Sequence, residues 1–352
     1  MARLITRKNY APVSNLFDWL FVACSGVWVA GVFTDGWAHI HLGSTLETFF
    51  TPWHALFYSG ILLVTALLLV QAGRNHIKGY TWRRSLPREY MFALCGMIFV
   101  FIGGPGDLFW HNLFGVEEGI EALLSPTHIL LALGGAIAVS GPLHAIWYRD
   151  RKLQMIHKIP VVLSFAYLLM TLGFMLQFLH PFNFPWMAES FLAGHPIAVN
   201  YAGGLGIANA IVFTGIFMGL VLASVRHWIF PFGSFALILG LNAVAVTLMH
   251  GAYYYFILTA LIGGVLIDFF YQAFCSLELK ERHIRIFGIF APMALFVTYA
   301  ASILVVDTSP WSVHMWGGMI VIAGLTGYLL TYLVVPPGDG VPRTVRVKGP
   351  VV

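Results

Sequence analysis

The sequence predicts an all-α protein, a polytopic bundle of about ten transmembrane helices. Hydrophobic residues make up 59% of the chain and charged residues only 10%, whereas soluble domains carry about 25% charged residues. The apolar residues also gather into stretches near the roughly 20 residues that a helix needs to cross a bilayer. Both observations indicate that lipid surrounds most of the chain.

Ten apolar stretches follow one another along the chain, and each is expected to form one transmembrane helix. They cover residues 15–35, 51–71, 90–110, 127–148, 159–180, 203–225, 229–249, 252–274, 286–306 and 311–335. The first stretch runs on to Asp35 and His39, so we expect it to be retained rather than cleaved as a signal peptide. We expect one transmembrane domain: hairpins at 15–71 and 90–148, six helices within 159–335, and a tail at 336–352.

The basic residues predict how the helices are oriented. With an internal N-terminus, all 19 Lys and Arg fall in segments on the inner side: 1–14, 72–89, 149–158, 226–228, 275–285 and 336–352. This distribution follows the positive-inside rule, so both termini are expected to be cytoplasmic, in a bacterial or archaeal cell membrane. The positive charge is therefore a topology signal and predicts no nucleic-acid partner; the lipid bilayer is the expected partner.

One pattern of metal-binding residue types occurs twice. The first copy is Asp35, His39, Gly43, Glu47, Thr51, Pro52, His54 and Gly60, and the second is Asp107, His111, Gly115, Glu121, Ser125, Pro126, His128 and Gly134. In both copies Asp-x3-His is followed by Gly, and Glu lies four residues before Ser/Thr-Pro-x-His. This agreement predicts a duplicated N-terminal helical hairpin that carries a ligand set.

The spacing places the ligand candidates of each copy together. Residues four apart share one helix face, so Asp35 and His39 are expected side by side. Thr51 is a typical N-cap with proline at the first helical position, which puts His54 in the first turn of the next helix. The second copy repeats this arrangement. Each hairpin is thus expected to bring one Asp and two His to one point near the outer membrane face, with Glu47 or Glu121 nearby.

Carboxylates and imidazoles at membrane depth, with no basic residue on the same side, need compensation for their desolvation. A divalent cation prefers these ligand types. We therefore expect one dinuclear or two mononuclear metal sites, with His250 and His314 as further candidate ligands. The alternative is a His–Asp hydrogen-bond network that fixes the helix ends without metal.

Other polar residues on the expected outer side are given smaller roles. We expect Glu117 and Glu118 to be solvated in a longer loop and His41 to be a spare residue beside the site. His180 and His195 flank a proline-rich outer loop that contains Glu189. Asp268 is an isolated acid within a helix, and the sequence assigns it no role.

The Asp-x3-His pair at the outer end of one helix, with His at the start of the next, resembles the metal site of the C subunit of copper membrane monooxygenases, the particulate methane and ammonia monooxygenases. The resemblance covers about 20 residues per copy, and the second His follows the first by 15 positions in one copy and by 17 in the other. It implies copper bound by Asp35, His39 and His54, and by Asp107, His111 and His128.

The first functional hypothesis is a copper- or iron-dependent oxidoreductase, similar to a monooxygenase, acting on a small apolar or lipid-soluble substrate, with other membrane subunits as partners. The second is a zinc hydrolase of lipid ester or amide bonds with Glu47 or Glu121 as general base. The third is a non-enzymatic metal-binding or transport protein. A haem held by His54 and His128 would leave the neighbouring carboxylates without a role.

Overall fold

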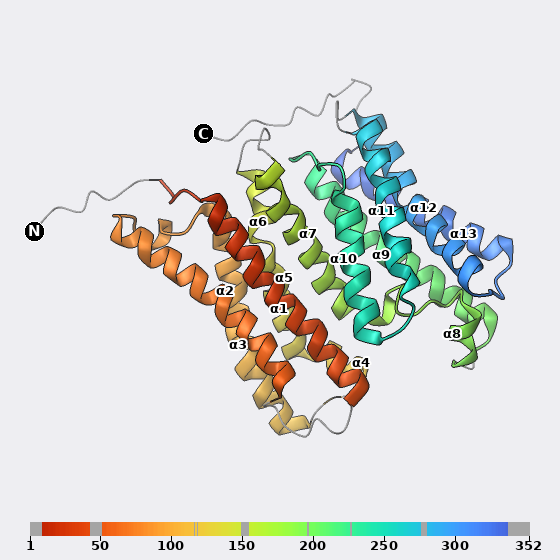
Figure 1. Cartoon of the computed structure of the whole chain (residues 1–352), viewed down its shortest axis with the longest axis horizontal. Coiled ribbons are helices and arrows are strands. Elements are labelled where there is room, and N and C mark those ends of the chain that lie inside the picture. The colour runs from red at the N-terminus through yellow and green to blue at the C-terminus, as the bar shows by residue number, and fades with distance from the viewer. Residues whose placement is uncertain are drawn as a thin grey trace, which may run out of the picture. The chain divides into compact units, whose positions relative to one another are not determined.

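The computed structural model describes residues 9–42, 51–115, 117, 119–148, 155–195, 197–225, 227–275 and 280–336. These residues form helices joined by short connections and contain no β-strand (Figure 1). The chain divides into two compact units, Met1–Met175 and Leu176–Val352. The all-helical prediction is confirmed for the part of the chain that the structure describes.

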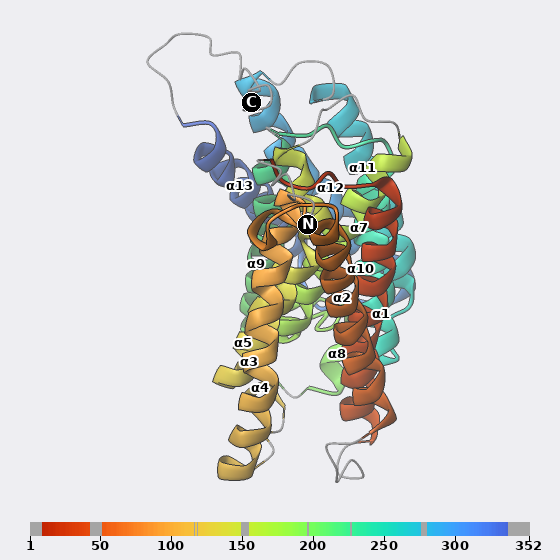
Figure 2. The same cartoon turned by 90° about the vertical axis from the view of Figure 1, so that its left-hand side faces the viewer.

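The first unit is built on two pairs of long helices. α1 (Asn15–Leu42) packs along α2 (Pro52–Ile77), and α3 (Met91–Phe114) packs along α5 (Pro126–Val139) (Figures 1 and 2). α7 (Met155–Met175) contacts both α1 and α5 and so joins the pairs. The short α4 (Ile120–Leu124) and α6 (Gly141–His144) flank α5. The helices of each expected hairpin therefore pack on one another, α1 on α2 and α3 on α5.

The repeated glycines of the motif lie where the paired helices cross. A Cβ atom on Gly60 of α2 would lie 2.3 Å from the Cα of Trp28 on α1. A Cβ atom on Gly134 of α5 would lie 2.8 Å from the carbonyl oxygen of Gly96 on α3. Small residues let helix backbones approach closely where lipid offers no hydrophobic driving force. These two glycines thus set the separation of the helices that carry the candidate ligands.

In the part that the structure describes, the second unit contains a 3-10 turn at Gln177–Leu179, the short α8 (Glu189–Ala193) and five longer helices. These are α9 (Val199–Val225), α10 (Ser234–His250), α11 (Tyr255–Phe274), α12 (Glu281–Val306) and α13 (Val313–Val334). Consecutive helices from α10 to α13 pack on one another, and α13 packs on α9. The unit is a bundle of sequential neighbours, as short connections favour.

Asp268, which the sequence left without a role, stabilises the start of α10. Its carboxylate oxygens accept the backbone N–H groups of Phe235 at 3.2 Å and Ala236 at 3.1 Å. The first N–H groups of a helix have no partner within the helix, and an acid there also complements the helix dipole. The buried carboxylate is therefore a helix cap supplied by α11, which is a structural role.

Eight helices of the described chain are long and apolar enough to cross a membrane, and a bent pair makes nine. The expectation of one straight helix over 127–148 is wrong, because this segment forms the bent pair. That segment turns by 52° between α5 and α6, where Pro142 lies in the first turn of α6 and cannot continue the hydrogen bonding of α5. α10 is shorter than a typical span, with 17 residues. The count of ten stays a prediction.

Candidate metal centre

The first cluster, which we call triad 1, consists of Asp35, His39 and His54. Asp35 and His39 lie one turn apart near the end of α1, and His54 lies in the first turn of α2. The Nε2 atom of His39 is 3.7 Å from Oδ2 of Asp35, and the Nε2 atom of His54 is 3.5 Å from Oδ1. Both imidazoles thus face one carboxylate, as the i,i+4 spacing and the helix start predict.

The N-cap of α2 fixes the ring of His54. The Thr51 hydroxyl oxygen accepts the backbone N–H of His54 at 3.1 Å, which is the bond expected of an N-cap. The same oxygen lies 3.1 Å from Nδ1 of the His54 ring. Because Nδ1 is engaged by the cap, Nε2 is the ring nitrogen that faces Asp35.

The second cluster, triad 2, consists of Asp107 and His111 of α3 and His128 of α5. The Nε2 atom of His111 is 3.2 Å from Oδ2 of Asp107, and Nδ1 of His128 is 3.6 Å from Oδ1. The Asp107 side chain is 7% exposed, against 20% for Asp35. The second carboxylate is therefore the more deeply buried of the two.

Residues that flank the ligands in the second copy of the motif fix the local geometry of triad 2. Gly115 ends α3 with φ +86°, a conformation that side chains rarely adopt. Ser125 caps α5 by accepting the backbone N–H of His128 at 3.3 Å. The Thr127 hydroxyl donates to Oδ1 of Asp107 at 2.7 Å. The turn, the cap and this hydroxyl together hold Asp107 opposite the two imidazoles.

Each triad fits a divalent metal ion. Its three potential ligand atoms lie within 4.8 Å of one another. Since metal–nitrogen and metal–oxygen distances are about 2.0–2.2 Å, two ligands of one ion lie at most about 4.4 Å apart. Small side-chain rotations would therefore suffice for binding. Within the described chain, neither Asp35 nor Asp107 forms an ion pair with lysine or arginine, so a cation would supply the missing positive charge.

The two triads are close enough to influence one another. His39 of triad 1 interacts electrostatically with His111 and His128 of triad 2. Tyr58, one turn after His54 on α2, interacts with both Asp35 and Asp107. Its ring centroid is 6.2 Å from that of His54. Tyr58 lies outside the repeated motif, although its i,i+4 spacing from His54 is a signal that could have identified it.

The glutamates are arranged differently from the expectation. Glu47 lies outside the described residues. Glu121 is exposed on α4, and its backbone carbonyl accepts the N–H of Ser125; a catalytic role for either residue stays a prediction. The expectation that Glu117 is solvated is wrong: its two carboxylate oxygens are buried, and Oε2 lies 3.0 Å from Nδ1 of His111.

His250 and His314 belong to the second unit, and their role as ligands stays a prediction. The Nε2 atom of His250 lies 3.2 Å from Oε1 of Gln177. His314 is exposed in the first turn of α13. Neither belongs to a cluster of three potential ligands among the residues that the structure describes.

Two other histidines have structural partners. His41 stacks on Trp37 with ring centroids 5.0 Å apart, and its Nδ1 lies 2.9 Å from the Trp37 carbonyl oxygen. His180 is buried, its Nδ1 accepts the N–H of Phe182 at 3.2 Å, and its Nε2 lies 2.9 Å from the Asn242 amide. Burial and the neighbouring His250 lower the pKa of His180 to about 3, so this ring is neutral.

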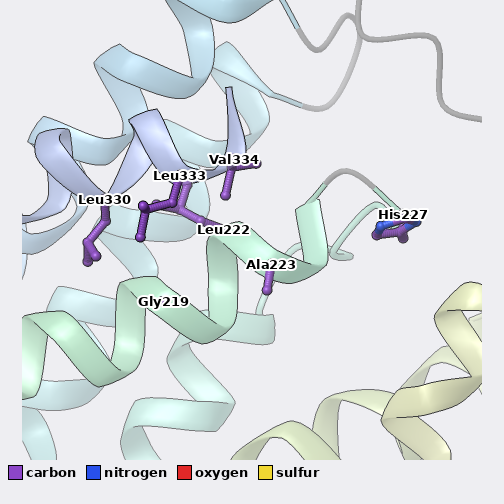
Figure 3. Close-up of a pocket in the computed structure, with 7 residues that line it drawn as sticks. All are labelled: Gly219, Leu222, Ala223, His227, Leu330, Leu333 and Val334. Carbon is purple, nitrogen blue, oxygen red and sulfur yellow. The ribbon is translucent and has the colours of Figure 1, made fainter. Parts of the chain in front are cut away.

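A cavity of about 380 Å³ in the second unit has a different character. Figure 3 shows aliphatic side chains of α9 and α13 along it and His227 on the connection after α9. Its lining residues are Gly219, Leu222, Ala223, His227, Leu330, Leu333 and Val334. With one imidazole and no carboxylate or thiol, this cavity has no set of metal ligands.

No protein-family model matches the chain, and no curated protein or solved structure compared with it matches either. The likeness to the monooxygenase C subunit therefore rests on the motif alone. The fold and the site define a helical protein with membrane-length helices and two neighbouring clusters of two His and one Asp. The chemistry of those clusters is the basis for a function.

Proposed function

We propose that this protein is a membrane metalloenzyme whose first unit binds transition-metal ions at triads 1 and 2. The observation that carries the proposal is the convergence of two imidazoles and one carboxylate, twice, on ligand atoms within 4.8 Å of one another. Asp35 and Asp107 would each offset part of the charge of a divalent ion, and the histidines would supply neutral nitrogen ligands. The proximity of His39 in triad 1 to His111 and His128 in triad 2 supports paired sites.

The reaction class that suits these ligand sets best is oxidation. Two His and one carboxylate leave positions open on the metal, an arrangement used by iron oxygenases, and imidazole suits copper equally. A copper or iron ion bound there would supply oxygen activation. Trp37 and Trp53 pack edge to face, with centroids 5.6 Å apart, next to triad 1. Such aromatic walls suit a small apolar or lipid-soluble substrate.

We further propose that the triads face away from the cytoplasm, with both termini on the cytoplasmic side. The arrangement of the 19 Lys and Arg supports this orientation. A reporter fused to each terminus tests it: activity of a cytoplasm-dependent reporter at both ends is expected. Activity of a reporter that requires export, at either end, would contradict the orientation.

Identification of the native metal separates the reaction classes. We expect elemental mass spectrometry of gently purified protein to find copper or iron, and oxygen uptake to rise when apolar substrates are added. His54→Ala/His128→Ala should abolish both, while His41→Ala, which alters an exposed imidazole outside the triads, should abolish neither. Zinc in place of copper or iron would favour hydrolysis of lipid esters or amides. Absence of metal in the wild type would reject the proposal.

A further inference from the structure

Triad 2 has a neighbouring carboxylate that the proposed function does not use. Glu117 follows Gly115, the residue at which α3 ends. Its side chain is 13% exposed, and Oε2 lies 3.0 Å from Nδ1 of His111. Neither carboxylate oxygen of Glu117 makes a hydrogen bond among the described residues, and Nδ1 of His111 lies within ion-pair distance of Oε2. A buried carboxylate is costly without a partner, so the contact with His111 is its compensation.

The two ring nitrogens of His111 face different groups. Nε2 lies 3.2 Å from Asp107, whereas Nδ1 lies 3.0 Å from Glu117 and 3.3 Å from the carbonyl oxygen of Gly115. A neutral imidazole that binds a metal through Nε2 carries its proton on Nδ1. Both groups near Nδ1 are hydrogen-bond acceptors. They therefore favour the tautomer in which Nε2 is free to bind a metal ion beside Asp107.

Among the residues that the structure describes, triad 1 lacks these supports. The His39 side chain is 50% exposed, and no described carboxylate other than Asp35 contacts it. The position that Thr127 occupies in the second copy of the motif is Trp53 in the first, which offers no hydroxyl to Asp35. The two copies thus share their ligand types but differ in the groups that hold the ligands.

We propose that Glu117 is a positioning residue for His111 and makes triad 2 the tighter of the two metal sites. This inference rests on the proposed function, because it assumes that the triads bind metal. A carboxylate that accepts the second N–H of a ligating histidine fixes the ring and raises its basicity, and its loss typically weakens metal binding by about 10–100-fold. Limiting metal should accordingly fill triad 2 first.

The test uses Cu²⁺ and the full chain in two backgrounds. His39→Ala/His54→Ala leaves triad 2 alone, and His111→Ala/His128→Ala leaves triad 1 alone. Copper Kd is measured by competition with a chelator of known affinity. In the triad 2 background, Glu117→Ala is expected to raise Kd by about 10–100-fold. Glu117→Gln, which keeps the side-chain volume but removes the charge, should raise Kd less. Glu189→Gln, the same change at an exposed glutamate of the second unit, should have no effect.

A spectroscopic readout separates positioning from general support of the fold. Pulsed electron paramagnetic resonance detects the non-coordinating nitrogen of a copper-bound imidazole, and its signal depends on the hydrogen bond made there. The signal should change in Glu117→Gln and Glu117→Ala but not in Glu189→Gln. In the triad 1 background, Glu117→Ala should leave copper Kd unchanged.

The outcomes distinguish this inference from the proposed function. If neither parental background binds copper, the proposed function fails. If the triad 2 background binds copper and its Kd and remote-nitrogen signal are the same in Glu117→Ala and Glu117→Gln, the Glu117 inference fails while the proposed function stands. Equal weakening of both triads by Glu117→Gln would also overturn it, because a positioning residue of His111 affects one site.

Discussion

A side chain added at Gly60, where α1 and α2 touch, should push these helices apart and so weaken metal binding at triad 1. In Gly60→Ala the new Cβ atom would lie 2.3 Å from Cα and 2.5 Å from N of Trp28. These are backbone atoms and cannot rotate away. An ordinary contact begins near 3.4 Å, so α1 and α2 have to separate by about 1 Å at this point.

Two energies compete in this substitution. Overpacking a tight contact typically costs about 1–3 kcal/mol, whereas replacing glycine by alanine within a helix contributes about 1 kcal/mol of favourable propensity. The protein should therefore fold with a small loss of stability. Metal sites tolerate ligand displacements of only about 0.2 Å. A movement of about 1 Å between the helices that carry Asp35 and His54 should weaken copper binding at triad 1 by about tenfold or more.

The assay measures copper Kd at each triad separately, in the two single-triad backgrounds. Gly73→Ala, also on helix α2, is the matched control, because a Cβ atom at Gly73 would meet no atom within 4 Å. Gly134→Ala is the reciprocal change and should weaken triad 2 instead, since its Cβ atom would lie 2.8 Å from the Gly96 carbonyl oxygen. Equal copper affinities of triad 1 in Gly60→Ala and Gly73→Ala would show that the separation of α1 and α2 does not control this site.

Two further predictions concern the cap and a buried histidine. Ser125→Ala removes the hydroxyl that caps α5 and lies 2.6 Å from Nδ1 of His128, so thermal stability in detergent should fall, by about 1 kcal/mol, and copper binding at triad 2 should weaken; unchanged values for both would contradict the assigned role. Burial and His250 lower the pKa of His180 to about 3. In the unfolded chain this imidazole has a pKa near 6.5. The contribution of neutral His180 to the free energy of unfolding is therefore fully present above about pH 6.5 and falls by about 2 kcal/mol at pH 5. His180→Asn should flatten that slope in thermal melts between pH 5 and 7, and an unchanged slope would assign it to other groups.

The features of this chain that sequence could predict are local ones. The Asp-x3-His spacing puts two ligands on one helix face, and Ser/Thr-Pro starts the next helix, so triads 1 and 2 could be inferred from neighbours in the chain. Gly60 and Gly134 also belong to the repeated pattern, although their part in helix crossing became visible only with the partner helix in place.

The features that sequence missed depend on contacts between helices. The bond from Thr127 to Asp107 was not predicted, because most helices here are apolar on all sides and show no periodicity that would identify the face turned toward a neighbour. Glu117 was expected in water since it lies in a connection with Glu118. Its burial follows from the position of His111, which hydropathy does not encode. The bend between α5 and α6 was missed because the hydropathy of 127–148 is continuous across Pro142.

The most direct test of the central claim is the number of metal ions bound per chain in four proteins. Elemental mass spectrometry after gentle purification would compare the wild type, His54→Ala, His128→Ala and the double variant. We expect about two ions in the wild type, about one in each single variant and none in the double variant. Equal metal content in the wild type and the double variant would contradict this expectation and leave triads 1 and 2 as hydrogen-bonded histidine–carboxylate networks.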